Sequence, residues 1–217
     1  MDIVISLGGS VINGGKININ LLKKSIDYIK KSKDRFFVVC GGGNIAREYT
    51  NAAKKIEKNK KSYDLIGIEA TRLNAKFVEL LAKASNVKAI YSDKLEIKKG
   101  YKLVSYGGYS PGHTTDYDTI VIAKKLKAKL IFNVTDVDFI YDKNPKKYKK
   151  AKPIKELSWD EYFKLIPKKH TPSEHLPFDY NAAKLAKVSK IDMYSFSWKN
   201  FIKYMEDKKV KGSFVYC

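Results

Sequence analysis

The sequence predicts an α/β fold, a three-layer sandwich with a mostly parallel central sheet and helices on both faces. Short apolar segments of strand length alternate along the chain with longer segments of helical periodicity. The strand segments are apolar throughout, which is typical of parallel strands covered by helices on both sides. Three of them end in glycine-rich turns. Because 217 residues can bury a full core, we expect residues 1–217 to form a single domain.

The first half of the chain contains four of the predicted strands, at residues 2–7, 36–40, 87–91 and 103–106. The pattern predicts helices from about residue 19, at 44–58 with Asn44 as the N-cap, at 62–84, and at 116–126. In the long third helix we expect the core-facing side to carry Leu73, Phe77, Leu80 and Ala84.

The second half continues the alternation with a buried strand at 130–134. A loop rich in lysine and proline follows at 143–153, and a helix is predicted at about 159–166. Another helix opens at Asp179, a strand is expected at 191–195, and a short helix and strand close the chain. The apolar segments are too short to span a bilayer and no secretory signal is visible, so we expect a cytoplasmic protein without membrane contact.

The net charge of +20 raises the question of nucleic-acid binding. The lysines cluster at 54–61 and 146–152, and no basic stripe interleaved with aromatics or known reading motif accompanies them. We therefore read the lysines as a solvated surface that attracts phosphorylated metabolites, and we do not expect nucleic acid as a partner. Cys40, Cys217, His170 and His175 lack the spacing of a metal site.

The glycine-rich turns are the strongest functional signal. They lie at 8–10, at 41–43 and at 107–108, and the third leads into the polar segment 110–116. Glycine allows backbone N–H groups to approach an anion, and the carboxyl ends of parallel strands share one sheet edge, so these turns predict a phosphate site there. Neither the Walker A pattern nor the dinucleotide G-x-G-x-x-G pattern is present.

The order of these motifs resembles the archaeal-type UMP kinases of the amino acid kinase family. The matching segments are LGGS at 7–10, GGGNIAR at 41–47, DLIGI at 64–68, PGHTTD at 111–116, VTDVD at 134–138 and DYNAAK at 179–184. The resemblance implies the amino acid kinase fold, also called carbamate kinase-like, with residues 1–128 binding the monophosphate and 129–217 binding ATP. It also implies transfer of the γ-phosphoryl group of ATP to UMP, with Mg²⁺ accompanying ATP, and assembly as a hexamer of dimers.

The resemblance also implies roles for individual residues. The residues expected to be catalytic are Lys184, Arg47 and Asp138. Asp138 is expected to orient Lys184 or to hold magnesium indirectly. The residues expected to contact ATP are Gly8, Gly9, Ser10, Gly43, Arg47, Thr135, Tyr141 and Asn144. The residues expected to contact UMP are Gly42, Asp64, Ser110, Pro111, Gly112, His113, Thr114, Thr115 and Asp116, of which Thr114 or Thr115 also suits a helix N-cap.

One departure from the family pattern concerns Ser6, because many members carry lysine there, two residues before the first glycine pair. Its absence shifts charge stabilisation onto Lys184, Arg47 and Mg²⁺. Two alternatives stay open. One is a related kinase such as isopentenyl phosphate kinase. The pattern of that subgroup has a catalytic histidine after the glycine loop, where this chain has Asn44. The other is a non-catalytic protein, either a nucleotide sensor or an RNA-binding relic.

Overall fold

The computed structural model describes the whole chain except residues 18, 83–85, 91–93, 168–175 and 208–210. Its described residues form a main sheet with the strand order β3-β4-β2-β1-β5-β9-β10-β8. The pairs along this sheet are parallel, except that β10 runs antiparallel to β9. Their bounds are β1 Asp2–Leu7, β2 Arg35–Cys40, β3 Val87–Ile90, β4 Leu103–Tyr106, β5 Leu130–Thr135, β8 Glu156–Ser158, β9 Asp192–Ser197 and β10 Ser213–Tyr216. The prediction of a mostly parallel sheet is confirmed.

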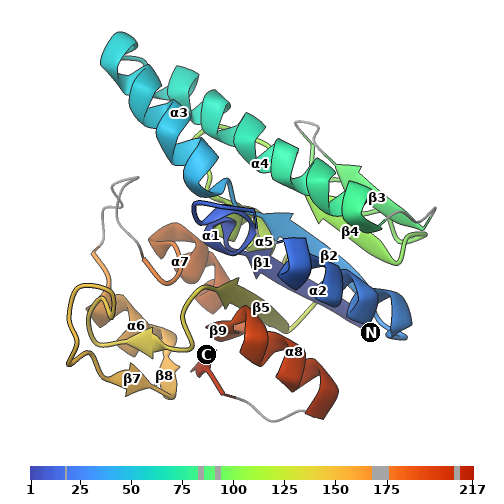
Figure 1. Cartoon of the computed structure of the whole chain (residues 1–217). Helices are drawn as coiled ribbons and strands as arrows, with labels where there is room; N and C mark the ends of the chain where they lie inside the picture. Colours follow the sequence, from blue (N-terminus) through green and yellow to red (C-terminus); the bar gives the residue numbers. More distant parts are fainter. Residues whose placement is uncertain (18, 83–85, 91–93, 168–175, 208–210) are drawn as a thin grey trace.

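Helices connect most of these strands (Figure 1). Their bounds are α1 Gly9–Asn13, α2 Ile19–Lys31, α3 Gly43–Ile56, α4 Lys60–Ala82, α5 Thr115–Leu126, α6 Trp159–Leu165, α7 Tyr180–Val188 and α8 Trp198–Asp207. A separate two-stranded ladder pairs β6, Ile140–Tyr141, with β7, Pro153–Ile154, across the lysine-rich loop. This ladder, β8 and α1 escaped the sequence analysis because such short elements carry too few residues to show a period.

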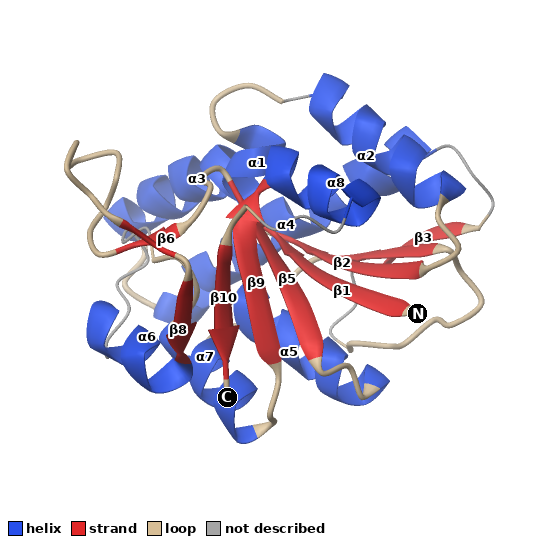
Figure 2. Cartoon of the chain, turned by 90° about the horizontal axis from the view of Figure 1, so that it is seen from below, coloured by secondary structure: helices blue, strands red, loops and turns tan. Residues whose placement is uncertain are grey.

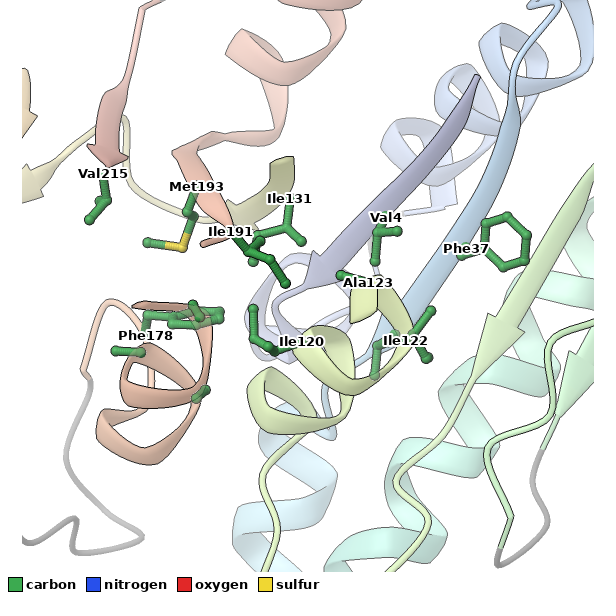
Figure 3. Packing of buried hydrophobic residues seen from close by; sticks show 14 of the residues in the cluster. Val4, Phe37, Ile120, Ile122, Ala123, Ile131, Phe178, Ile191, Met193 and Val215 are labelled. Carbon is green, nitrogen blue, oxygen red and sulfur yellow. The ribbon is translucent and has the colours of Figure 1, made fainter. Parts of the chain in front are cut away.

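The three layers enclose two cores, one on each face of the sheet (Figure 2). On one face, Ile5 and Phe36 of the strands pack with Leu22 of α2, Val78 of α4 and Phe201 of α8. On the opposite face the strands pack against α5, α6 and α7. Figure 3 shows this second core, whose labelled side chains are Val4, Phe37, Ile120, Ile122, Ala123, Ile131, Phe178, Ile191, Met193 and Val215. Burial of central strands on both faces explains their uninterrupted apolar sequences.

The predicted core face of α4 is wrong. Leu73 and Leu80 are 55% and 62% exposed, and Phe77 is only half-buried, while Ala84 lies outside the described residues. The core-facing residues of α4 are instead Ile68, Ala70, Thr71, Asn74, Ala75, Val78 and Ala82. Small and polar side chains occupy this face because the helix lies close to the glycine turns. The large apolar residues therefore lie on the opposite face, and a prediction based on apolar spacing chooses that face instead.

The predicted cap of α3 is also wrong. The helix begins at Gly43 with Gly42 in the N-cap position, and no side chain caps it. Asn44 lies inside the first turn, where its Oδ1 accepts a hydrogen bond from Arg47. For α5 the structure decides between the two threonines: Thr114 Oγ1 accepts from the Tyr117 N–H at 3.2 Å and is the N-cap.

In the part of the chain that the structure describes, no helix combines the length and the apolar character needed to cross a membrane.

Candidate functional site

The three glycine turns follow β1, β2 and β4 at one edge of the sheet. These strands are parallel neighbours, so their carboxyl ends coincide, and β5 ends beside β1 at the same edge. The Gly8 N–H donates to the Val134 carbonyl at 2.8 Å, which joins the first turn to the end of β5. The strand order reverses at β1, because β2, β3 and β4 lie on one side of it and the next strand in the chain, β5, lies on the other. Ligands of parallel α/β sheets gather at such topological switch points.

The first two glycine turns touch each other through their backbones. A Cβ on Gly9 would lie 2.0 Å from the Gly43 nitrogen, and one on Gly41 would lie 2.5 Å from the Gly9 nitrogen. Gly43 also has a φ of +67°, a conformation that disfavours other residues. These positions therefore need glycine because no side chain fits between the turns, and the contact aligns the N-termini of α1 and α3.

A cavity of about 520 Å³ opens over these two turns, and we call it the glycine-turn cavity. All eight residues predicted to contact ATP line it. Of the predicted residues it is lined by Gly8, Gly9, Ser10, Gly42, Gly43, Arg47, Thr115, Asp116, Thr135, Tyr141 and Asn144. Gly42, predicted on the UMP side, therefore faces the cavity predicted for ATP. Lys143, Lys146 and Asp136 are among the other polar residues that line it.

A second cavity, of about 1020 Å³, lies between α4, α7 and the segment after β4, and we call it the α4–α7 cavity. Of the predicted residues it is lined by Asp64, Gly112, His113, Thr114, Thr115 and Lys184. Lys60 and Asn181 also line it. Within the described chain, Ser110 and Pro111 line neither cavity, and they form the turn in which Ser110 O accepts from the His113 N–H at 3.4 Å.

The two cavities adjoin, because Ala46 and Thr115 line both of them. Arg47 lines the first cavity and Lys184 the second, so each of the two predicted cations belongs to a different cavity. The glycine turns lie at a single sheet edge, as expected, and the two cavities adjoin there. Two anions bound end to end would meet at this junction.

Asp116 ties three elements together at the junction. Ser6 Oγ of β1 donates to Asp116 Oδ1 at 2.8 Å, and the Asp179 N–H donates to Oδ2 at 3.0 Å. Burial raises the pKa of Asp116 to about 6, against the lowering effect of the Ser6 hydrogen bond. Asp179 in turn caps α7, since its Oδ1 accepts from the Ala182 N–H at 2.9 Å. Ser6, which breaks the family pattern, thus helps to place the helix that carries Lys184.

Asp118 is a second buried carboxyl group, one turn into α5. Burial raises its pKa to about 8, and a hydrogen bond from the Tyr109 backbone opposes this rise. Among the described residues, its Oδ1 finds no hydrogen-bond partner. The protonated form therefore predominates at neutral pH. The hydrogen bond from the Tyr109 backbone to Asp118 holds the start of the segment that leads to Gly112 and His113.

This raised pKa predicts how stability depends on pH. Because the unfolded pKa is near 3.8 and the folded one near 8, the contribution of Asp118 is greatest in acid and is lost between about pH 4 and 8. Asp118→Asn cannot ionise, so its urea midpoint should fall less than that of the wild type between pH 5 and pH 8. Equal decreases in both proteins would contradict the assignment.

The expected pairing of Asp138 with Lys184 is not present. Asp138 Oδ1 accepts from Asn200 Nδ2 at 2.9 Å and Oδ2 lies 3.6 Å from Lys211 Nζ. In the described structure Asp138 lines neither cavity. Asp138 lies one residue past the lining residue Val137, and a tight turn points successive side chains in different directions, which explains why the pairing with Lys184 is not formed. The alternative role, holding magnesium indirectly, stays a prediction.

The segment after β4 presents aromatic rings beside the α4–α7 cavity. The His113 ring stacks on Tyr117 with centroids 4.5 Å apart and meets Tyr109 at 5.4 Å. Asp64 Oδ2 accepts from the Gly112 N–H at 3.2 Å, which holds this segment against α4. The structure therefore places Asp64 in contact with Gly112, and both line the same cavity as His113.

Two polar residues of α4 with a supporting role were missed. Thr71 Oγ1 accepts from the Gly108 N–H at 2.6 Å, and Asn74 Nδ2 donates to the Gly41 carbonyl at 2.7 Å. Both side chains are buried and hold two of the glycine turns. Their spacing of three residues places both on the same face of the helix as several alanines. That pattern could have indicated that these polar side chains turn inward.

Comparisons with known proteins agree with this geometry. Residues 1–197 match the model of the amino acid kinase family. The uridylate kinase of Archaeoglobus fulgidus is 34% identical over 197 residues, covering 89% of this chain and 90% of the relative. That of Methanobrevibacter smithii is 32% identical over 219 aligned positions, covering 97% of each.

Solved structures give the same result. The crystal structure of uridylate kinase from Archaeoglobus fulgidus matches with a TM-score of 0.80 at 31% identity, covering 99% of this chain and all of that chain, 100%. UMP kinase from Ureaplasma parvum matches with a TM-score of 0.79 at 23% identity, covering 100% and 99%, which supports the fold alone. Fold and site thus define an α/β kinase class with adjoining cavities at the switch point of a parallel sheet. The chain belongs to the amino acid kinase family.

Proposed function

We propose that this chain is a UMP kinase that transfers the γ-phosphoryl group of ATP to UMP, forming UDP and ADP. The observation that carries the proposal is the pair of adjoining cavities, one over the glycine turns and one beside Lys184, which meet at Ala46 and Thr115. The likeness to curated uridylate kinases over most of both chains supports the choice of substrate.

ATP is assigned to the glycine-turn cavity. The backbone N–H groups of the glycine turns that line this cavity and the N-terminus of α3 can donate hydrogen bonds to the phosphates. Arg47 adds a planar cation for the same groups. Thr135, Tyr141 and Asn144 line the same cavity near the end of β5 and are assigned to the adenine and ribose. Bound together with ATP, Mg²⁺ would supply positive charge against the phosphates in this cavity.

UMP is assigned to the α4–α7 cavity. Asp64 and the backbone near Gly112 suit the ribose hydroxyls, and the threonines after His113 suit the uracil edge. Lys184, which lines this cavity, is assigned to the phosphoryl group in transfer. Asp116 is assigned a positioning role between β1 and α7 rather than a contact with the base.

The chemistry needs little more than alignment. A UMP phosphate oxygen is already largely ionised at neutral pH, so no side chain has to remove a proton from it. The chain's own contribution is to hold donor and acceptor in line and to stabilise the charge of the transition state with N–H groups, Arg47 and Lys184.

The test is a coupled assay of ADP formation from ATP and Mg²⁺ with UMP, CMP, AMP, GMP and isopentenyl phosphate as separate acceptors. We expect UMP to give the highest kcat/KM. A higher value for isopentenyl phosphate would replace the proposed substrate. Thermal stabilisation by UMP without turnover would identify a nucleotide sensor instead.

We also propose that the chain forms a homo-oligomer, which the family resemblance implies, and that α4 supplies an interface. Ile66, Leu73 and Leu80 recur every seven residues and are 37%, 55% and 62% exposed, so they form an apolar stripe on one face of the helix. A second copy of the same stripe is the simplest cover for it.

Changing Leu73 and Leu80 together to Glu should convert the oligomer to monomers without unfolding, because both side chains lie outside the core. Light scattering after size exclusion measures the mass. The control is Ile56→Glu at the end of α3, where the isoleucine is 89% exposed and away from the stripe. An unchanged mass for the double variant would reject this interface.

A further inference from the structure

Lys146 stands out among the cations on the rim of the glycine-turn cavity because of its partner. Its ammonium group forms an ion pair with Asp136, and both residues line the cavity. The ammonium group of Lys143 lies 5.8 Å from the centroid of the Tyr148 ring, and the Arg47 guanidinium donates a hydrogen bond to Asn44 Oδ1. Of these three rim cations in the described structure, Lys146 is thus the one whose charge is held by a carboxylate of the cavity itself.

The ion pair lies close to the first glycine turn. Asp136 follows Thr135, whose Cα is 3.7 Å from the position of a Cβ on Gly8, and the Gly8 N–H bonds to the end of β5. The backbone of Lys146 is fixed independently of the ion pair, since its N–H donates to Asn144 Oδ1 at 2.9 Å. Lys146 is therefore held in place at the rim while its side chain can exchange partners.

Exchange requires that the existing pair be weak, and its exposure indicates that it is. The side chains of Lys146 and Asp136 are 58% and 37% exposed, and exposed ion pairs contribute little to stability. A polyphosphate offers several charged oxygens in place of one carboxylate, and contacts of ammonium groups to phosphate are among the stronger hydrogen bonds. The balance favours the phosphate once ATP is bound.

We propose that Lys146 releases Asp136 on ATP binding and contacts the ATP phosphates. It then supplies at this edge a positive charge that Ser6, in place of the usual first-strand lysine, cannot provide. Asp136 holds the ammonium group at the cavity until the nucleotide arrives. The inference rests on the proposed function, because it assigns ATP to the glycine-turn cavity.

The test measures dissociation constants of ATP and adenosine by calorimetry for the wild type, Lys146→Met and Asp136→Asn, with Lys149→Met as the matched control. Lys149 lies on the same loop, is exposed, and does not line the cavity in the described structure. Lys146→Met should weaken ATP binding by about tenfold, the loss of one charge-assisted contact, and leave adenosine binding unchanged. Asp136→Asn should tighten ATP binding, because Lys146 is then free.

The opposite signs distinguish this role from a structural one. If the ion pair only braces the loop, both variants loosen it, and both weaken ATP and adenosine binding alike. That result would overturn the inference, as would equal ATP affinities for Lys146→Met and Lys149→Met. Wild-type protein that binds no ATP would instead overturn the proposed function.

Discussion

Lys184→Ala should lower kcat for UMP phosphorylation by roughly 100- to 1,000-fold, while the dissociation constants of ATP and UMP change far less. Lys184 lines the α4–α7 cavity on the helix that Asp179 caps, and its ammonium group has no partner in the described structure. In the assigned role, this cation stabilises the charge on the phosphoryl group in transfer more than it stabilises either bound substrate, so its removal acts on turnover.

The matched control for this prediction is Lys187→Ala, on the same helix one turn later. Lys187 pairs with Asp160 at 2.6 Å, and both side chains are exposed. Its loss should leave kcat near the wild-type value, because such surface pairs contribute little. Stopped-flow or coupled assays together with calorimetry separate turnover from binding. Equal turnover by Lys184→Ala and the wild type would remove Lys184 from its assigned role.

Gly9→Ala should destabilise the fold by about 3 kcal/mol and lower turnover by about 100-fold. The added Cβ would lie 2.0 Å from the Gly43 nitrogen and 2.7 Å from the Gly43 Cα. Both atoms belong to backbone, so the two glycine turns must separate, and the N–H groups that we assign to the ATP phosphates then lose their common alignment.

The control for this change is Gly100→Ala. A Cβ at Gly100 meets no atom within 4 Å, and Gly100 is an exposed residue outside both cavities. Its free energy of unfolding should stay within about 0.5 kcal/mol of the wild type. Urea denaturation provides the comparison. If Gly9→Ala unfolds at the same urea concentration as Gly100→Ala, the contact between the turns is not a constraint.

Much of the fold was predictable because the central strands are buried on both faces. The predicted strand at 103–106 is confirmed residue by residue as β4, and the predicted glycine turns lie at the ends of β1, β2 and β4. Cys40, the last residue of the predicted strand at 36–40, is buried at the end of β2. The core face of α4 was not predictable from apolarity, because the helix turns Thr71 and Asn74 inward to the glycine turns and leaves Leu73 outside.

The site was predictable in its components but not in its pairings. The turns and Lys184 were found in the sequence because glycine runs and family motifs are local. Asp138 was misplaced, and the link from Ser6 through Asp116 to Asp179 was invisible, since its members lie 110 and 63 residues apart. His170 and His175 lie outside the described residues, so their interpretation stays a prediction.

The sequence alone determined the alternation of strands and helices, the three glycine turns and their order, because each depends on neighbouring residues and on the burial of short strands. Only the tertiary structure decided that the first two turns pack backbone to backbone, that two cavities meet at Ala46 and Thr115, and that Lys146 pairs with Asp136. These contacts join residues far apart in the chain, and only the packing of the whole sheet edge fixes their distances.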